Sequence, residues 1–103
     1  MEAVERFADV VDGFADDPGV EPPRPGARGF GARALRAGGA ICAMHDVYGR
    51  FVVKLDPARV GELLDAGAGA RFDNGHGRAM RAWVVLGPEQ DWAEFAREAR
   101  ERA

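Results

Sequence analysis

The spacing of apolar residues changes along this chain from a helical repeat to a strand-like repeat and back, which limits how the chain can fold. Near the start, Val4, Phe7, Val11 and Phe14 recur every three or four residues, with charged side chains between them. This spacing places the apolar residues on one side of a helix and predicts an amphipathic helix of about three to four turns. Asp17-Pro18-Gly19 is a typical stop signal for that helix, and a Pro-rich connection follows it.

Residues 30–55 predict three antiparallel strands joined by short turns. Gly38-Gly39 is typical of a two-residue hairpin turn, and Asp46–Gly49 supplies the next turn. The strand between these turns, Ala40–His45, is apolar on both faces, which indicates a central strand covered on one side and partly shielded on the other. The third strand, Arg50–Leu55, is expected to alternate between two faces. One face would carry Phe51, Val53 and Leu55, and the other Val52 and Lys54.

The rest of the chain predicts a helix, one or two strands and a final helix. Asp56-Pro57 is expected to cap and begin the middle helix, and Gly67 to end it. Phe72 anchors a Gly- and Arg-rich stretch that could form a short strand, and Arg81–Leu86 reads as the last full strand. Gly87-Pro88-Glu89 is expected to open the last helix. Strands grouped between helices predict an α+β domain with one antiparallel sheet and helices packed on one face.

Length and composition narrow the class of protein. The chain has 103 residues, which suits a single domain spanning residues 1–103. Its one cysteine, Cys42, excludes an internal disulfide. The acidic start and the lack of a long apolar run predict neither a signal peptide nor a membrane span, so we expect a cytoplasmic protein. The chain has no serine or threonine, which excludes a P-loop and a serine nucleophile.

Charge is distributed unevenly around a net value of −3. Residues 1–23 carry a net charge of −6, residues 24–81 carry +5, and residues 82–103 carry −2. Two interpretations are open at this stage. The acidic ends can be the solvated faces of surface helices, or the basic middle can form a patch for an anionic partner.

Several segments together carry a resemblance to a known family. They are Ala40–Met44, Gly49–Leu55, Arg59-Val60, Gly67 and Arg71–Val85. The most specific part is the F-D-x-G-x-G-R-x-M-x-x-W pattern of Phe72–Trp83. In these residues the chain resembles the TfoX N-terminal domain family, and in particular its stand-alone, single-domain bacterial members. The resemblance extends from about Phe14 to the last helix.

The resemblance implies both a fold and a general role. The fold is a two-layer α-β3-α-β2-α arrangement, similar to YjbR-like domains and type III secretion chaperones, with a real strand near Phe72. The multidomain namesake regulates competence, which links the domain to transcriptional control. The family supplies no catalytic residues and no cofactor. This chain departs from the family pattern with Asn74 in place of Pro and Arg81-Ala82 in place of Lys-Glu.

The segment Gly75-His76-Gly77-Arg78 is the candidate for an anion site. Glycines on both sides of a histidine allow close approach of the backbone and expose N–H groups. Together with Arg71, Arg81 and conceivably Lys54, His76 and Arg78 could hold a phosphate or a carboxylate. The alternative is a tight structural loop in which the arginine pairs with Asp73 or a backbone carbonyl.

Cys42 and His45 are the residues that could suggest nucleophilic chemistry. Cys42 lies in an apolar strand, where a thiol usually packs as a small hydrophobic group. On a flat strand, residues three apart point to opposite faces, so we expect the two side chains to be separated. A zinc site would need further ligands at a recognisable spacing, and none is evident, so no metal is expected.

Two functional hypotheses follow from these observations. The first is a non-enzymatic binding or adaptor domain that contacts a protein or a nucleic acid through the exposed sheet face, or associates with itself. Its nucleic-acid version requires Arg33, Arg36, Arg50 or Arg78 to cluster on one surface. The alternative is a domain that binds a small anionic ligand with Arg71, His76, Arg78 and Arg81, which would need a concave pocket. Neither hypothesis involves a cofactor, a metal or a membrane.

Overall fold

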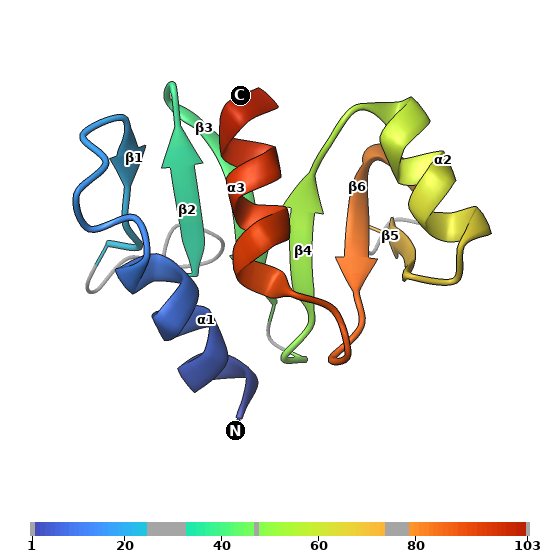
Figure 1. The fold of residues 1–103 in the computed structure, drawn as a ribbon, viewed down its shortest axis with the longest axis horizontal. Helices are drawn as coiled ribbons and strands as arrows, with labels where there is room; N and C mark the ends of the chain where they lie inside the picture. The colour runs from blue at the N-terminus through green and yellow to red at the C-terminus, as the bar shows by residue number, and fades with distance from the viewer. Residues whose placement is uncertain (1, 25–32, 47, 74–78, 103) are drawn as a thin grey trace.

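The computed structural model describes residues 2–24, 33–46, 48–73 and 79–102, which form three helices and six strands. In chain order the elements are α1 (Ala3–Asp12), β1 (Val20–Glu21), β2 (Ala34–Ala37), β3 (Ala40–His45), β4 (Phe51–Lys54), α2 (Pro57–Asp65), β5 (Gly69–Asp73), β6 (Ala79–Leu86) and α3 (Trp92–Arg102). Figure 1 shows helices near both ends of the chain and the sheet between them.

All six strands belong to one sheet in the order β1-β2-β3-β4-β6-β5, and every neighbouring pair is antiparallel. The structure therefore confirms the predicted α+β class with one antiparallel sheet. It also contains the strand expected near Phe72, which is β5. One strand was not expected. This strand is β1, which lies just before the prolines of the Pro-rich connection. Its Val20 pairs with Ala37 of β2, so β1 forms one edge of the sheet.

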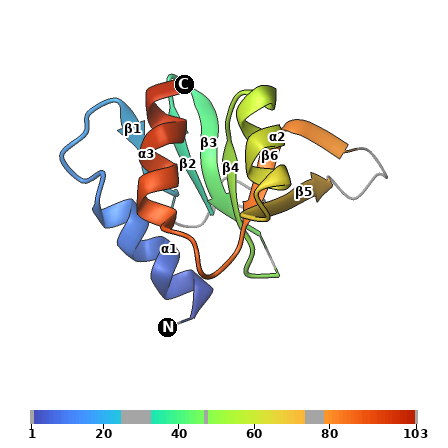
Figure 2. The ribbon, with the colours of Figure 1, turned by 45° about the vertical axis from the view of Figure 1, so that its right-hand side comes forward.

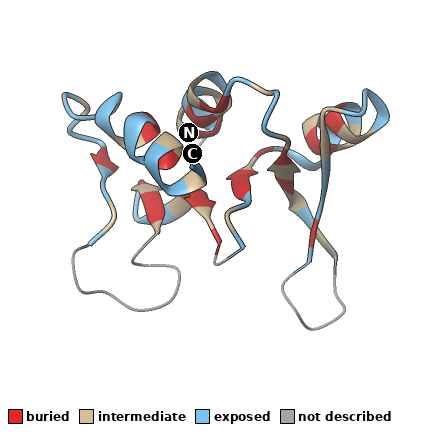
Figure 3. Ribbon diagram, turned by 90° about the horizontal axis from the view of Figure 1, so that it is seen from below, coloured by how far each residue is buried: buried red, intermediate tan, exposed pale blue. Residues whose placement is uncertain are grey.

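The helices lie on one face of the sheet. α3 packs over β3 and β4, α2 packs over β5 and β6, and α1 packs beside α3 (Figures 1 and 2). Viewed from below, the three helices line the same side of the strands (Figure 3). The main core forms between the two layers. Its fully buried members include Phe51, Val53, Val60, Val84 and Ala96, which are at most 1 % exposed.

The predicted alternation in β4 is confirmed, and it divides the core into two clusters. Phe51, Val53 and Leu55 belong to the main core under the helices. Val52 points the other way and belongs to a second apolar cluster. Alternate residues of a strand face opposite sides of a sheet, so one strand contributes to both clusters.

Alternation fails in β3 because the strand contains an irregularity. Leu35 pairs with Ala43 but Arg36 pairs with Ile41, which leaves Cys42 as an extra residue. A single extra residue in one strand is a β-bulge, and it reverses the facing of the side chains beyond it. Cys42 and Ala43 consequently both face the helices.

The ends of the helices differ in part from expectation. α1 stops at Asp12, before Phe14, and Val4 is 59 % exposed rather than part of the buried stripe. Figure 1 shows the start of α1 extending below the ends of the strands. α3 begins only at Trp92, because Gly87–Gln90 forms a turn first and the Asp91 carboxylate accepts a hydrogen bond from the Glu94 N–H at 3.1 Å.

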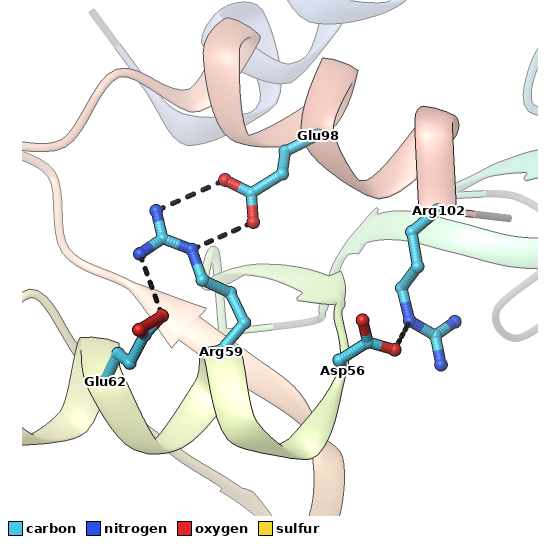
Figure 4. A network of polar contacts seen from close by, with 5 residues as sticks. All are labelled: Asp56, Arg59, Glu62, Glu98 and Arg102. Atoms are coloured by element: carbon cyan, nitrogen blue, oxygen red, sulfur yellow. Dashed lines mark hydrogen bonds and ion pairs between the residues drawn. The ribbon is translucent and has the colours of Figure 1, made fainter.

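Charged side chains join α2 to α3 (Figure 4). Arg59 donates two hydrogen bonds to the Glu98 carboxylate, at 2.9 and 3.2 Å, and also lies 3.5 Å from Glu62. Asp56 occupies the position before α2, but its carboxylate makes no capping hydrogen bond there. It accepts instead from Arg102 at 2.9 Å, so Asp56 and Pro57 hold their predicted positions at the start of α2 while the Asp56 side chain links the two helices.

A second ion pair attaches the segment before β1 to α3. Arg100 donates to both oxygens of Asp17, at 3.0 and 3.3 Å, and the Gly19 N–H donates to the same carboxylate at 2.9 Å. The hydrogen bond from Arg100, supported by that from Gly19, lowers the pKa of the Asp17 carboxyl. Glycine suits position 19 because a side chain there would press into the Arg100 guanidinium.

Within the part of the chain that the structure describes, each helix is too short or too polar to reach across a lipid bilayer.

Phe51→Ala tests the main core. Phe51 is fully buried and contacts rings from both α1 and α3, so we expect a loss of about 3–5 kcal/mol in the free energy of unfolding. Tyr48→Ala is the matched control, because Tyr48 is 81 % exposed and its removal should cost within about 0.5 kcal/mol. Urea denaturation followed by circular dichroism gives both values. Equal losses for the two variants would contradict this packing.

The Asp17–Arg100 pair predicts a pH dependence of stability. A carboxyl whose pKa is lowered by folding stabilises the protein above the usual Asp pKa of about 3.9. That contribution is lost as the pH falls through the lowered value. The melting temperature of Asp17→Asn should therefore lie below that of the wild type at neutral pH, and the gap should close as the solution becomes strongly acidic. The exposed neighbour variant Asp16→Asn should show no gap at either pH.

Candidate functional site

The anion site expected from the sequence falls partly outside the described residues. His76 and Arg78, with the glycines around them, are not among the residues that the structure describes. Arg71 lies on β5 and Arg81 on the neighbouring strand β6, and both are exposed. The anion site therefore remains a prediction.

Lys54 does not share a face with Arg71. Arg71 pairs with Val84, whose side chain is buried under the helices. Lys54 pairs with Trp83, which belongs to the cluster on the other side of the sheet. Directly paired residues point to the same face, so Arg71 and Lys54 point to opposite faces.

The face of the sheet opposite the helices carries an apolar centre. Eight residues from β2 to β6 form it, and we call the surface that they make the helix-free face: Ala34, Ile41, Met44, Val52, Phe72, Met80, Trp83 and Val85. Four of them are buried, and Ile41, Met80, Trp83 and Val85 are partly exposed. No helix of the described residues lies over this apolar cluster, and an apolar surface of this kind is a typical place for a partner to bind.

Cations from β2, from β4 and from the turn before β4 lie along the helix-free face. The Lys54 ammonium is 5.9 Å from the centre of the Trp83 ring. The Arg50 guanidinium is 5.6 Å from the centres of the Phe72 and Tyr48 rings. Arg36 pairs with Ile41 in register and so points to this face as well.

The cations on the helix-free face are less neutralised than those among the helices. Among the described residues, no carboxylate lies within 4.0 Å of the charged groups of Arg36 or Lys54. Arg59, Arg100 and Arg102, in contrast, all form ion pairs with acids. These cations can attract negative charge from outside the domain, although Glu21 lies beside Arg36 as its register partner and Asp46 pairs with Arg50.

Asp46 holds the turn that positions Arg50 and Tyr48. This carboxylate is buried and accepts hydrogen bonds from the Tyr48 N–H and the Arg50 N–H, both at 2.9 Å. It also pairs with the Arg50 guanidinium. Tyr48 is 81 % exposed, so the turn presents an aromatic ring to solvent at the end of the sheet.

Arg33 does not belong to this group of cations. It is half-buried, and its Nε atom is buried without a hydrogen-bond partner in the described structure. Its charge contributes to lowering the pKa of His45, which lies on the helix side of the sheet. Of the arginines that a nucleic-acid surface was expected to use, Arg36 and Arg50 therefore lie on the helix-free face and Arg33 does not.

Cys42 and His45 lie on the same side of the sheet, which corrects the expectation of opposite faces. The bulge at Cys42 turns its side chain into the main core, and the His45 ring lies 4.9 Å from the Phe7 ring. Burial raises the pKa of the Cys42 thiol, which is 4 % exposed and lies 3.6 Å from the Leu35 carbonyl oxygen. Burial, followed by the charge of Arg33, lowers the pKa of His45. Both shifts favour the uncharged form of the group, and the thiol is largely buried in the wall of a cavity that Lys54 and Ala99 also line.

No three metal-binding side chains of the described residues come close enough together to hold a metal ion. The helix-free face presents cations and aromatic rings. They can hold an anion or an apolar surface.

Sequence reasoning found some of this face and missed the rest. The alternation in β4 predicted the direction of Lys54, and the apolar run of β3 indicated a partly shielded second side. The exposure of Tyr48 was missed, although the turn signal at Asp46–Gly49 would have supported it.

The chain matches no family model, no curated protein and no solved structure.

The burial of Cys42 predicts a slow thiol reaction. In the native protein, modification by a thiol reagent should proceed only through opening of the fold. A cysteine at the exposed position of Ala8, in a Cys42→Ala background, should react at least about a hundredfold faster. Absorbance of the released thiol reagent follows both reactions. Rapid labelling of Cys42 in the native state would refute the assignment of a sealed thiol.

Proposed function

We propose that this chain is a non-enzymatic binding domain whose helix-free face holds a partner protein with an apolar centre and acidic groups around it. The observation that carries the proposal is an apolar surface beside two cations, Arg36 and Lys54, that form no ion pair in the described chain. Arg36 and Lys54 have no carboxylate within 4.0 Å in the described chain, and they lie beside partly exposed apolar side chains. Apolar contacts would supply affinity, and the cations would select an acidic surface.

The composition of the face favours a protein partner over a nucleic acid. A base-stacking platform needs a row of exposed aromatic rings, whereas on this face Phe72 is only 4 % exposed, Trp83 is partly exposed, and Tyr48 stands exposed at the end of the sheet. The partly exposed centre is largely aliphatic, with Ile41, Met80 and Val85. The net charge of −3 also opposes general binding to a polyanion.

The biological setting of the proposal comes from the sequence resemblance alone. We place the chain with the stand-alone bacterial members of the TfoX N-terminal domain family, in the cytoplasm. On that basis the partner belongs to a complex that regulates transcription, and this domain acts as an adaptor within it.

Charge reversals on the two sides of the sheet test this proposal. Arg36→Glu and Lys54→Glu each introduce repulsion toward an acidic partner, while Arg97→Glu makes the same change on an exposed position of α3. A protein captured from an extract of the source organism is purified, and its affinity for each variant is measured by calorimetry. We expect each sheet variant to bind at least about fivefold more weakly, with Arg97→Glu unchanged.

Two results would contradict the proposal. One is equal affinity of the partner for all three variants and the wild type, which would place the interface elsewhere. The other is capture that disappears after nuclease treatment, because the bound species would then be a nucleic acid. Circular dichroism of each variant establishes that a lost interaction does not come from unfolding.

A further inference from the structure

A cleft lies at the lower edge of the sheet, away from the centre of the helix-free face. Three segments meet there: the start of α1, the turn between β3 and β4, and the connection from β6 to α3 (Figure 1). The cleft between them has a volume of about 280 Å³. That volume is near the lower end of the range for small-molecule sites, so it suits a ligand the size of a single ring with a short side chain.

The inner wall of the cleft is apolar and rigid. Trp92 stacks on Phe51 with their ring centres 4.7 Å apart and their planes 12° from parallel. Leu86 lies in the same wall, and all three side chains are at most 5 % exposed. The Trp92 indole N–H donates to the Gly87 carbonyl oxygen at 3.0 Å, which fixes the ring. A wall of this kind favours a flat apolar group.

Arg6 places a fixed positive charge in this cleft. Its guanidinium lies 4.0 Å from the centre of the Trp92 ring and donates to the carbonyl oxygens of Pro88 and Gln90. Those two bonds leave further N–H groups of the five that arginine carries. In the described chain no carboxylate lies within 4.0 Å of Arg6. A half-buried charge that only carbonyl oxygens satisfy favours an external anion.

Arg50 lines the opposite side of the cleft. Its Nε atom pairs with Asp46, which leaves its two terminal nitrogens directed away from that bond. Asp46 neutralises Arg50, and the Glu89 carboxylate lies close to Gly87 at the rim of the cleft. Arg6 is a cation of the cleft without a carboxylate within 4.0 Å in the described chain, which favours a ligand with no more than one negative charge.

From these observations we propose that the cleft binds a small carboxylate with a flat apolar body, of the arylalkyl carboxylic acid class. Phe51 and Arg6 lie over the faces of the Trp92 ring, so the ligand ring lies against Leu86 and the edge of Trp92, and the carboxylate accepts hydrogen bonds from Arg6 and Arg50. This site shares Arg50 and Val85 with the border of the helix-free face but does not depend on the function proposed for that face.

The two tryptophans make the proposal testable in one NMR experiment. Trp92 lies in the cleft and Trp83 on the helix-free face, so their indole N–H signals report on the two sites separately. Phenylacetate is titrated into ¹⁵N-labelled protein, and phenylacetamide serves as the neutral compound of the same shape. We expect phenylacetate to shift the Trp92 signal to saturation while the Trp83 signal stays in place, and phenylacetamide to bind at least tenfold more weakly.

Variants of the cationic residues supply the second arm. Arg6→Gln and Arg50→Gln should each weaken phenylacetate binding at least tenfold, and Arg97→Gln on the outer surface of α3 should leave it unchanged. If Arg6→Gln fails to fold, Arg50→Gln and the two compounds decide the question. An absence of saturable shifts at Trp92, equal binding of both compounds, or a shift confined to Trp83 would each overturn the proposal. None of these results bears on capture of a partner protein by the helix-free face.

Discussion

Contact of Phe51 with rings from two helices is the interaction on which the rest of the structure depends. Phe51 is fully buried in β4, with Phe7 of α1 6.1 Å away on one side and Trp92 of α3 4.7 Å away on the other. These contacts hold both terminal helices on the same face of the sheet, and no helix of the described residues lies on the other face. They also bring Arg6 above Trp92, so one buried ring determines the position of both candidate sites.

The one-sided covering has an electrostatic consequence. Between α2 and α3, ion pairs neutralise Arg59 and Arg102. Between α3 and the segment before β1, an ion pair neutralises Arg100. On the helix-free face, Arg36 and Lys54 lie beside apolar side chains. Among the described residues, no carboxylate lies within 4.0 Å of their charged groups. The unequal charge seen along the sequence thus becomes a difference between two faces. Apolar contact and charge then act on the same partner.

The features predicted correctly from sequence depend on regular repeats within single elements. The two-residue period of β4 assigned Phe51 and Lys54 to opposite faces, and helical spacing located the three helices approximately. The bulge at Cys42 was not predictable, since one extra residue leaves the apolar composition of β3 unchanged. The cleft at Arg6 was missed as well. Residues from three segments that are distant in the sequence form it, and no local sequence pattern indicates that these segments come together.

The central claim is that helices cover only one face of this sheet, and hydroxyl-radical footprinting tests it most directly. The method compares how fast solvent radicals modify each side chain, read by mass spectrometry of peptides. The account predicts rapid modification of Tyr48 and measurable modification of Trp83 and Met80, with Trp92 protected until the protein unfolds. Protection of Trp83 equal to that of Trp92 in the isolated protein would contradict it, because the second face would then be covered as well.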